Sequence, residues 1–151
     1  TQPWCFGLLI LSKSSVYALR ALLCLAEEGG NDTVRVDDIA DRLDVPRNYL
    51  SKILHVLARE GVLASTRGPR GGFRLAIPAR DLRLSDIVRH FDDVPDGAQC
   101  LLGRERCLES DPCAAHARWK DVGAALRAFL AETSLADLDP VATRAMGQPM
   151  T

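Results

Sequence analysis

The chain has 151 residues, of which 47% are hydrophobic and 26% are charged, and its 19 Lys and Arg against 20 Asp and Glu leave a net charge of −1. This composition predicts one globular domain with its own hydrophobic core and excludes disordered, collagen-like and rod-like coiled-coil proteins. The longest apolar run, residues 4–11, counts eight residues, whereas a membrane-spanning helix needs about 18.

The start of the chain lacks the pattern of a secretory signal, because no Lys or Arg precedes the apolar run and no small-residue cleavage pattern closes it. We therefore expect a cytoplasmic protein with no membrane partner. Residues 1–10 are interpreted as a leader or as added residues, and they are left out of the fold prediction.

Three successive segments have apolar residues at helical spacing, and each ends at a helix-breaking signal. The first begins after Ser12, a favoured N-cap residue, and stops at the two glycines at 29–30. The second is about two turns long, begins near Asp37 and breaks before Pro46, and the third covers residues 47–60. A short helix joined by a tight turn to a longer one predicts a helix-turn-helix motif.

The third segment has one apolar face and one polar face. Its apolar residues recur at the spacing of a helix that packs on a core. Its other face carries hydrogen-bonding and cationic side chains that suit contacts with base edges and phosphates: Asn48, Ser51, Lys52, His55 and Arg59. This segment is therefore predicted to be the recognition helix.

Two short runs of alternating polarity, residues 63–67 and 73–77, predict a β-hairpin, and the stretch Gly68-Pro69-Arg70-Gly71-Gly72 between them supplies turn residues. A nucleotide-binding loop is excluded because these glycines lie between two strands and open no helix. A glycine-rich tip with Arg67 and Arg70 can lie against a phosphate backbone or enter a minor groove. The hairpin is therefore predicted to be a wing.

The basic residues of the chain are concentrated in the same region. Residues 46–80 hold seven Lys and Arg against one Glu, whereas residues 1–45 and 81–151 are net acidic. Such a block predicts a focused phosphate-binding surface. Together with the helix-turn-helix and the wing, it predicts an α+β, mostly helical, winged-helix domain that binds DNA over residues 11–80.

Three of the five cysteines, Cys100, Cys107 and Cys113, fall close together, and His116 follows them. Three thiolates and an imidazole within so short a stretch can converge on one metal centre. Zinc is one alternative, although zinc ligands usually come in pairs about two to four residues apart, and a reducing compartment disfavours a disulfide. These residues predict a metal or redox site without naming the metal. Cys24 lies in an apolar helix and is expected to be a buried thiol without a function.

The last predicted helix covers residues 114–133. A heptad seam runs along it, formed by Trp119, Val122, Leu126 and Phe129. Small residues beside the seam would let a partner helix approach closely. The seam is either part of the chain's own core or a dimer interface, and because helix-turn-helix domains commonly pair to read two half-sites, we expect a homodimer. Residues 139–151 are predicted to be a flexible tail.

Five stretches form a characteristic set: Leu-Ser-Lys-x3-Tyr-Ala at 11–18, Tyr-Leu-x2-Ile-Leu at 49–54, Arg-Gly-Pro-x-Gly-Gly-Phe-x-Leu at 67–75, the three-cysteine segment, and His-Ala-x-Trp-x-Asp at 116–121. In this order and combination they resemble the IscR/NsrR-type (Rrf2) family of bacterial winged-helix regulators. The resemblance implies a homodimeric repressor or activator that holds an iron–sulfur cluster, whose state alters the affinity for double-stranded operator DNA.

Carried over by position, the resemblance implies that Cys100, Cys107 and Cys113 hold the cluster and that His116 is the fourth ligand, as in IscR-like members with 2Fe–2S clusters. The family's nitric oxide sensors with 4Fe–4S clusters can use an Asp near the start of the first helix, and residues 12–15 here contain no carboxylate. Two features depart from the IscR-like pattern. The first cysteine interval has six intervening residues where five are typical, and a Ser stands at position 51, where a Glu can discriminate between operator classes.

The sequence thus predicts a transcriptional regulator, not an enzyme, whose cluster senses cluster supply, redox state or nitric oxide. A short helix and the cluster segment are expected at 81–113, and a dimerisation helix at 114–138. The predicted DNA contacts are Lys13, Tyr17, Arg67 and Arg70 to phosphates and Arg47, Asn48, Ser51 and Lys52 to bases. The alternatives are a 4Fe–4S cluster, a cluster-free thiol or zinc regulator of the same fold, and an iron–sulfur electron-transfer protein, which no Cys-x2-Cys motif supports.

Overall fold

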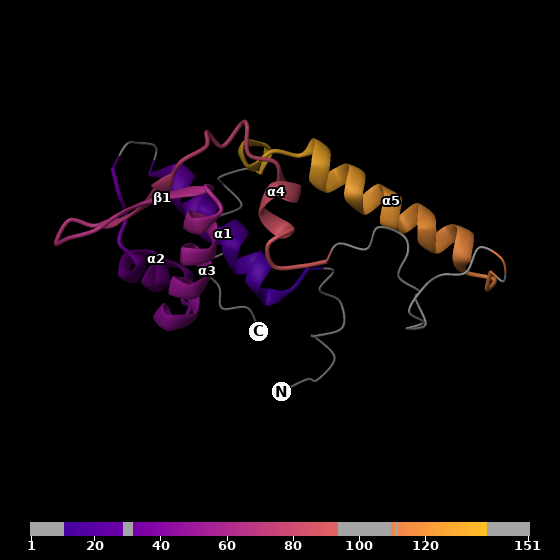
Figure 1. Cartoon of the computed structure of the whole chain (residues 1–151), viewed down its shortest axis with the longest axis horizontal. Coiled ribbons are helices and arrows are strands. Elements are labelled where there is room, and N and C mark those ends of the chain that lie inside the picture. The colour runs from indigo at the N-terminus through magenta and orange to yellow at the C-terminus, as the bar shows by residue number, and fades with distance from the viewer. Residues whose placement is uncertain (1–10, 29–31, 94–109, 111, 139–151) are drawn as a thin grey trace.

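The computed structural model of the protein describes residues 11–28, 32–93, 110 and 112–138. The elements in chain order are α1 (Lys13–Glu27), α2 (Val36–Leu43), α3 (Arg47–Arg59), β1 (Leu63–Thr66), β2 (Gly72–Leu75), α4 (Leu84–Val88), α5 (His116–Glu132) and the short 3-10 helix η2 (Leu135–Asp137). Helices α1 to α3 and the hairpin form one body, α4 lies beside α1, and α5 leads away from this body (Figure 1). The predicted winged-helix fold, mostly helical with a small sheet, is therefore present.

The first three helices agree with the prediction to within two residues at each end. Ser12 is the N-cap of α1, and its side chain accepts the N–H of Ser15 at 3.2 Å. Asp44 follows α2 in the left-handed conformation, with φ of 52°, and Pro46 is the N-cap of α3. This turn sets α3 at an angle to α2 over only three residues and makes the pair a helix-turn-helix.

The strands of the wing pair antiparallel, with Leu63 opposite Leu75 and Ser65 opposite Phe73. Gly68 adopts a φ of 107° in the connecting loop, a conformation that favours glycine. Strand β2 ends two residues before the predicted limit. The N–H of Ala76 still donates to the carbonyl oxygen of Val62 at 3.0 Å, but Pro78 has no N–H with which to continue the ladder.

Residues just before α2 fasten the wing to the body. Val34 and Phe73 exchange two backbone hydrogen bonds, at 2.9 and 2.8 Å. Gly72 lies so close to the carbonyl group of Val34 that a Cβ atom there would clash with it. The base of the wing is thus held by backbone contacts, and glycine is required at position 72.

Helix α1 is the centre of the hydrophobic core. Eight of its residues are buried, and α2, α3, β2 and α4 pack against it. The core includes these fully buried side chains: Ile39 of α2, Leu50, Leu54 and Leu57 of α3, Ile87 and Val88 of α4, and Leu130 of α5. Removing each such leucine from water is worth about 1.5–3 kcal/mol. The core therefore unites the DNA-binding elements with α4 and the end of α5.

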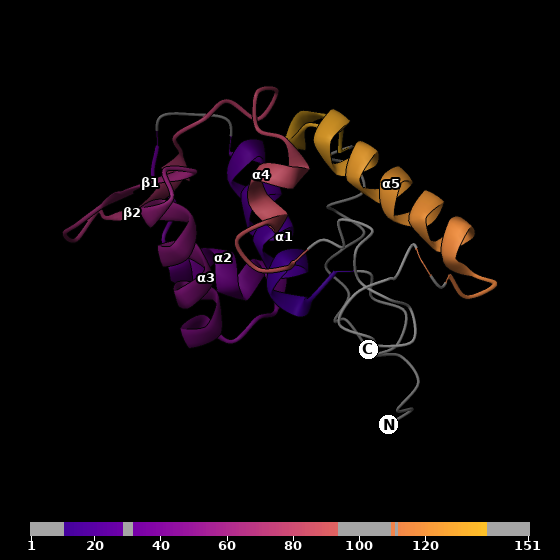
Figure 2. The same ribbon diagram turned by 45° about the vertical axis from the view of Figure 1, so that its right-hand side comes forward.

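Helix α5 begins at His116, two residues after the predicted start, and only its C-terminal end packs on the body (Figure 2). Two backbone hydrogen bonds hold that end, from Leu84 to the carbonyl of Thr133 at 3.0 Å and from Leu135 to the carbonyl of Leu82 at 2.8 Å. The rest of the helix extends away from the body.

We expect the substitution Gly72→Ala to lower the free energy of unfolding by about 1–3 kcal/mol, because a Cβ at this position must displace backbone atoms of Val34. Chemical denaturation measures the change. The matched control is Ser65→Ala, at an exposed position of the same hairpin, which should stay within about 0.5 kcal/mol of the wild type. Equal stability of the two variants would contradict the tight contact at the base of the wing.

Candidate nucleic-acid interface and metal-ligand segment

Helix α3 presents a polar face to solvent and buries the opposite one. Leu50, Ile53, Leu54 and Leu57 are buried. Asn48 and Lys52 are exposed and Ser51 is half-buried. The side chains that the sequence assigned to base contacts therefore lie outside the core, on the face of α3 that is available to a ligand.

Arg47, another predicted base contact, is engaged within the chain. Its guanidinium group forms a hydrogen-bonded ion pair with Asp37 of α2. Both side chains remain well exposed, so the pair is screened by salt and contributes little to stability. A phosphate could replace Asp37 as the partner of Arg47, but the structure gives Arg47 a structural partner that the sequence did not reveal.

The wing projects from the body on the side away from α5 (Figure 1). Arg67 and Arg70 are exposed near its tip. The hydroxyl group of Thr33 donates to the backbone carbonyl of Arg70 at 3.1 Å, which leaves the Arg70 side chain outside this contact. The hairpin thus carries two exposed arginines near its tip, on a backbone that is anchored at its base.

The first turn of α1 lies beside the first turn of α3. Tyr17 of α1 and Tyr49 of α3 pack edge to face, with ring centroids 5.7 Å apart. The hydroxyl oxygens of Ser14 and Tyr49 are 2.7 Å apart and form a hydrogen bond. Lys13, on the same turn, is exposed. This contact brings the predicted phosphate ligands Lys13 and Tyr17 to the recognition helix.

Tyr49 is not among the DNA contacts predicted from the sequence. Its side chain is 37% exposed, the largest exposed aromatic group on the described part of α3. The sequence does indicate this exposure, because Tyr49 directly precedes Leu50 and therefore falls outside the apolar stripe of the helix. Tyr49 therefore belongs to the candidate interface.

The predicted metal ligands are only partly described. Cys100 and Cys107 lie outside the described residues. Cys113 is half-buried, and its carbonyl oxygen accepts the N–H of His116, the first residue of α5, at 3.0 Å. The last predicted thiol and the predicted imidazole therefore share a single turn at the start of α5.

A thiol and an imidazole are ligands that both iron–sulfur clusters and zinc accept, so the donor set fits either group. Within the described ranges, no three His, Cys, Asp or Glu side chains gather in a way that could hold a metal ion. Cys24 is buried in α1, and burial raises the pKa of its thiol while the nearby Arg42 acts in the opposite direction. Cys24 has the environment of an inert core residue.

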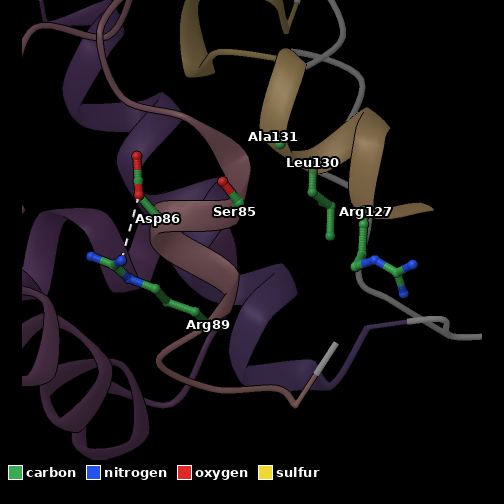
Figure 3. A pocket seen from close by; sticks show the side chains of 6 residues that line it. All are labelled: Ser85, Asp86, Arg89, Arg127, Leu130 and Ala131. Atoms are coloured by element: carbon green, nitrogen blue, oxygen red, sulfur yellow. Dashed lines mark ion pairs between the residues drawn. The ribbon is translucent and has the colours of Figure 1, made fainter. Parts of the chain in front are cut away.

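A hollow of about 320 Å³ lies between α4 and α5. Figure 3 shows the Arg89 side chain turned toward Asp86, with which it forms an ion pair at 3.7 Å, and the Arg127 side chain directed away from them. The hollow is largely apolar, and its lining consists of Ser85, Asp86, Arg89, Arg127, Leu130 and Ala131. We regard it as a result of how α5 packs on α4. No helix in the described part of the chain is long and apolar enough to cross a membrane.

Comparison with known proteins gives consistent results. The sequence model of the Rrf2 family, described as "Iron-dependent Transcriptional regulator", matches residues 11–139. The HTH-type transcriptional regulator IscR of Photorhabdus laumondii is 31% identical over 128 residues, which are 85% of this chain and 77% of that protein.

Solved structures show the same architecture. IscR of T. potens superposes with a TM-score of 0.69 at 27% identity, and the match covers 89% of each chain. CymR, the global cysteine regulator of B. subtilis, superposes with a TM-score of 0.72 at 24% identity, over 85% of this chain and 94% of that one. The latter similarity supports the fold alone.

Proposed function

The chain belongs to the Rrf2 family of DNA-binding transcriptional regulators, and we propose that it binds double-stranded operator DNA as a homodimer and holds an iron–sulfur cluster on its cysteine segment. Members of this family are regulators and not enzymes. The observation that carries the proposal is the exposed polar face of α3 next to the arginine-bearing wing.

In this proposal α3 enters the major groove. Asn48, Ser51 and Lys52 face base edges, and Arg47 exchanges its pairing with Asp37 for a DNA contact. Side chains of these types donate or accept hydrogen bonds at base edges or phosphates. The wing arginines, Arg67 and Arg70, together with Lys13 and Tyr17, contact the phosphate backbone. The net positive charge of residues 46–80 favours such an encounter at long range.

The exposed apolar face of α5 supports the homodimer. Val122 and Phe129 are 56% and 52% exposed, which leaves large apolar groups in water. A second copy of α5 would cover them, and the two recognition helices would then be held at a fixed separation. Leu126, by contrast, already packs partly against the chain's own core, so the interface proposed here centres on Val122 and Phe129, with Trp119 and Leu126 at its edge.

The cluster proposal rests on the donor set and on the family description as iron-dependent. Cys100, Cys107 and Cys113 would hold the cluster, with His116 as the fourth ligand, which suits a 2Fe–2S group. When bound, the cluster would act as the sensor, because its presence and oxidation state would depend on cluster supply, redox state or nitric oxide. His116 opens α5, so a ligand there is joined directly to the proposed dimer helix. Zinc on the same residues is the competing assignment.

We expect Arg67→Ala to weaken operator binding across sequences and Lys52→Ala to weaken it with a shallower salt dependence. Loss of one phosphate contact should change the slope of log affinity against log salt by about 1. Titrations at matched salt measure both effects. Arg89→Ala, which removes an exposed cation outside residues 46–80, is the control. Wild-type binding by both test variants would refute this docking arrangement.

We expect Val122→Asp combined with Phe129→Asp to convert the dimer into a folded monomer, because each carboxylate would lie in a dry contact without a partner. Sedimentation velocity at micromolar concentration measures the state. The control is Ala124→Asp, at an exposed position on the opposite side of α5, which should leave the dimer intact. A wild-type protein that is folded and monomeric would argue against the interface.

We expect anaerobically purified protein to be coloured and to contain about two iron and two acid-labile sulfide per subunit. Cys107→Ala should be colourless, and His116→Ala should hold a labile cluster with a shifted spectrum, because one imidazole is lost from the thiolate set. Cys24→Ala, which removes a core thiol, should keep its full colour. Stoichiometric zinc without sulfide, in protein made under iron-replete anaerobic conditions, would replace the cluster assignment by zinc.

A further inference from the structure

The N-terminus of α1 is capped by a residue that is distant in the sequence. A capping box normally pairs an N-cap Ser with a Glu or Gln three residues later. Here that later residue is Ser15, and the first turn of α1 contains no acidic residue. Asp92 supplies the missing carboxylate from 80 residues away. Its Oδ2 atom accepts the backbone N–H of Ser12 at 2.9 Å and the Ser12 hydroxyl at 3.0 Å.

The same oxygen of Asp92 accepts the hydroxyl of Ser15 at 2.5 Å, and Ser15 is completely buried. Hydrogen bonds to a carboxylate are stronger than those between neutral groups, and a negative charge is favourable at a helix N-terminus. Asp92 is itself fixed, because its N–H donates to the carbonyl of Val88 at the end of α4 at 2.9 Å. The end of the α4 segment therefore lies next to the start of α1, as both views show (Figures 1 and 2).

The turn that Asp92 holds is the turn that contacts the recognition helix. Between the two capped serines stands Ser14, whose hydroxyl is bonded to that of Tyr49, and the Tyr17 ring packs on Tyr49 one turn further along. Tyr49 lies in the first turn of α3, next to Asn48. A continuous series of contacts thus runs from Asp92 through the start of α1 to the start of α3.

We propose that Asp92 is a positioning residue for DNA binding: by capping α1 it fixes the turn that holds Tyr49 and thereby orients the first turn of the recognition helix. This inference rests on the proposed docking of α3 on DNA.

Without the Asp92 carboxylate, the first turn of α1 loses three hydrogen bonds and frays. Ser14 and Tyr17 then no longer hold Tyr49, and the start of α3 must be ordered when DNA binds. The ordering cost appears as weaker binding. Coupling between sites of this kind changes affinity by about 5 to 150-fold, and we expect Asp92→Ala to weaken operator binding by about tenfold.

The test compares Asp92→Ala with Asp93→Ala in the full chain. Asp93 is the exposed neighbour, so both variants lose the same charge, but only the first loses the cap. We expect Asp93→Ala to bind operator within about twofold of the wild type. Asp92→Asn retains one side-chain oxygen and should fall between the two. Equal affinities of the Asp92→Ala and Asp93→Ala variants would overturn the proposal.

A double-mutant cycle with Tyr49→Phe separates positioning from a general loss of stability. This variant removes the hydroxyl that bonds to Ser14 but keeps the ring that packs on Tyr17. If Asp92 acts through the Ser14 and Tyr49 contact, the effects of Asp92→Ala and Tyr49→Phe on affinity are not additive, and the double variant binds about as well as Asp92→Ala alone. Additive effects would show that Asp92 serves only the stability of α1.

Amide hydrogen exchange of the DNA-free protein tests the same link without the operator. Asp92→Ala should accelerate exchange both at the start of α1 and in residues 47–51, whereas Asp93→Ala should accelerate neither. Faster exchange confined to α1 would overturn the proposal. If the wild-type chain fails to bind any operator while α3 responds to Asp92→Ala, the proposed function fails and the link between Asp92 and the recognition helix stands.

Discussion

The burial of α1 is the constraint on which the rest of the structure depends. Helices α2, α3 and α4 and the wing strand β2 each pack against α1, and the C-terminal end of α5 packs on α4. The first turn of α1 has no acidic residue of its own and takes Asp92 as a cap. The helix that organises the DNA-binding body is therefore also attached to the segment that leads toward the cysteines.

The winged-helix body and helix α5 differ in how completely one protomer buries their apolar residues. The winged-helix body is complete within one protomer, because its apolar residues meet across α1, α3 and the wing. The apolar face of α5 is not buried within the protomer, since Val122 and Phe129 remain exposed. A helix with such a face gains stability when a second apolar surface covers it. A single protomer therefore presents the candidate DNA interface, whereas a second copy would cover the exposed apolar face of α5.

Patterns local in the sequence predicted most of the fold. Helix-breaking glycines and prolines and the recurrence of apolar residues located α1 to α3, and alternation located the wing. Contacts between distant residues left no such signal. Asp92 accepts a hydrogen bond from Ser12 at the N-terminus of α1, 80 residues away in the sequence. Arg47 pairs with Asp37 of the preceding helix. Periodicity alone also does not distinguish the partly covered Leu126 from the exposed Phe129 within one heptad seam. Among the predicted metal ligands, only Cys113 and His116 lie within the described residues.

The proposed coupling between the cluster and DNA binding is tested most directly by the operator affinity of one anaerobic preparation, measured by fluorescence anisotropy at constant salt before and after removal of the proposed cluster. The proposed function predicts a change in affinity of about 5 to 150-fold, because the proposed ligand His116 is the first residue of α5 and α5 is the proposed dimer helix. Identical affinities of the loaded and the cluster-free protein would contradict it.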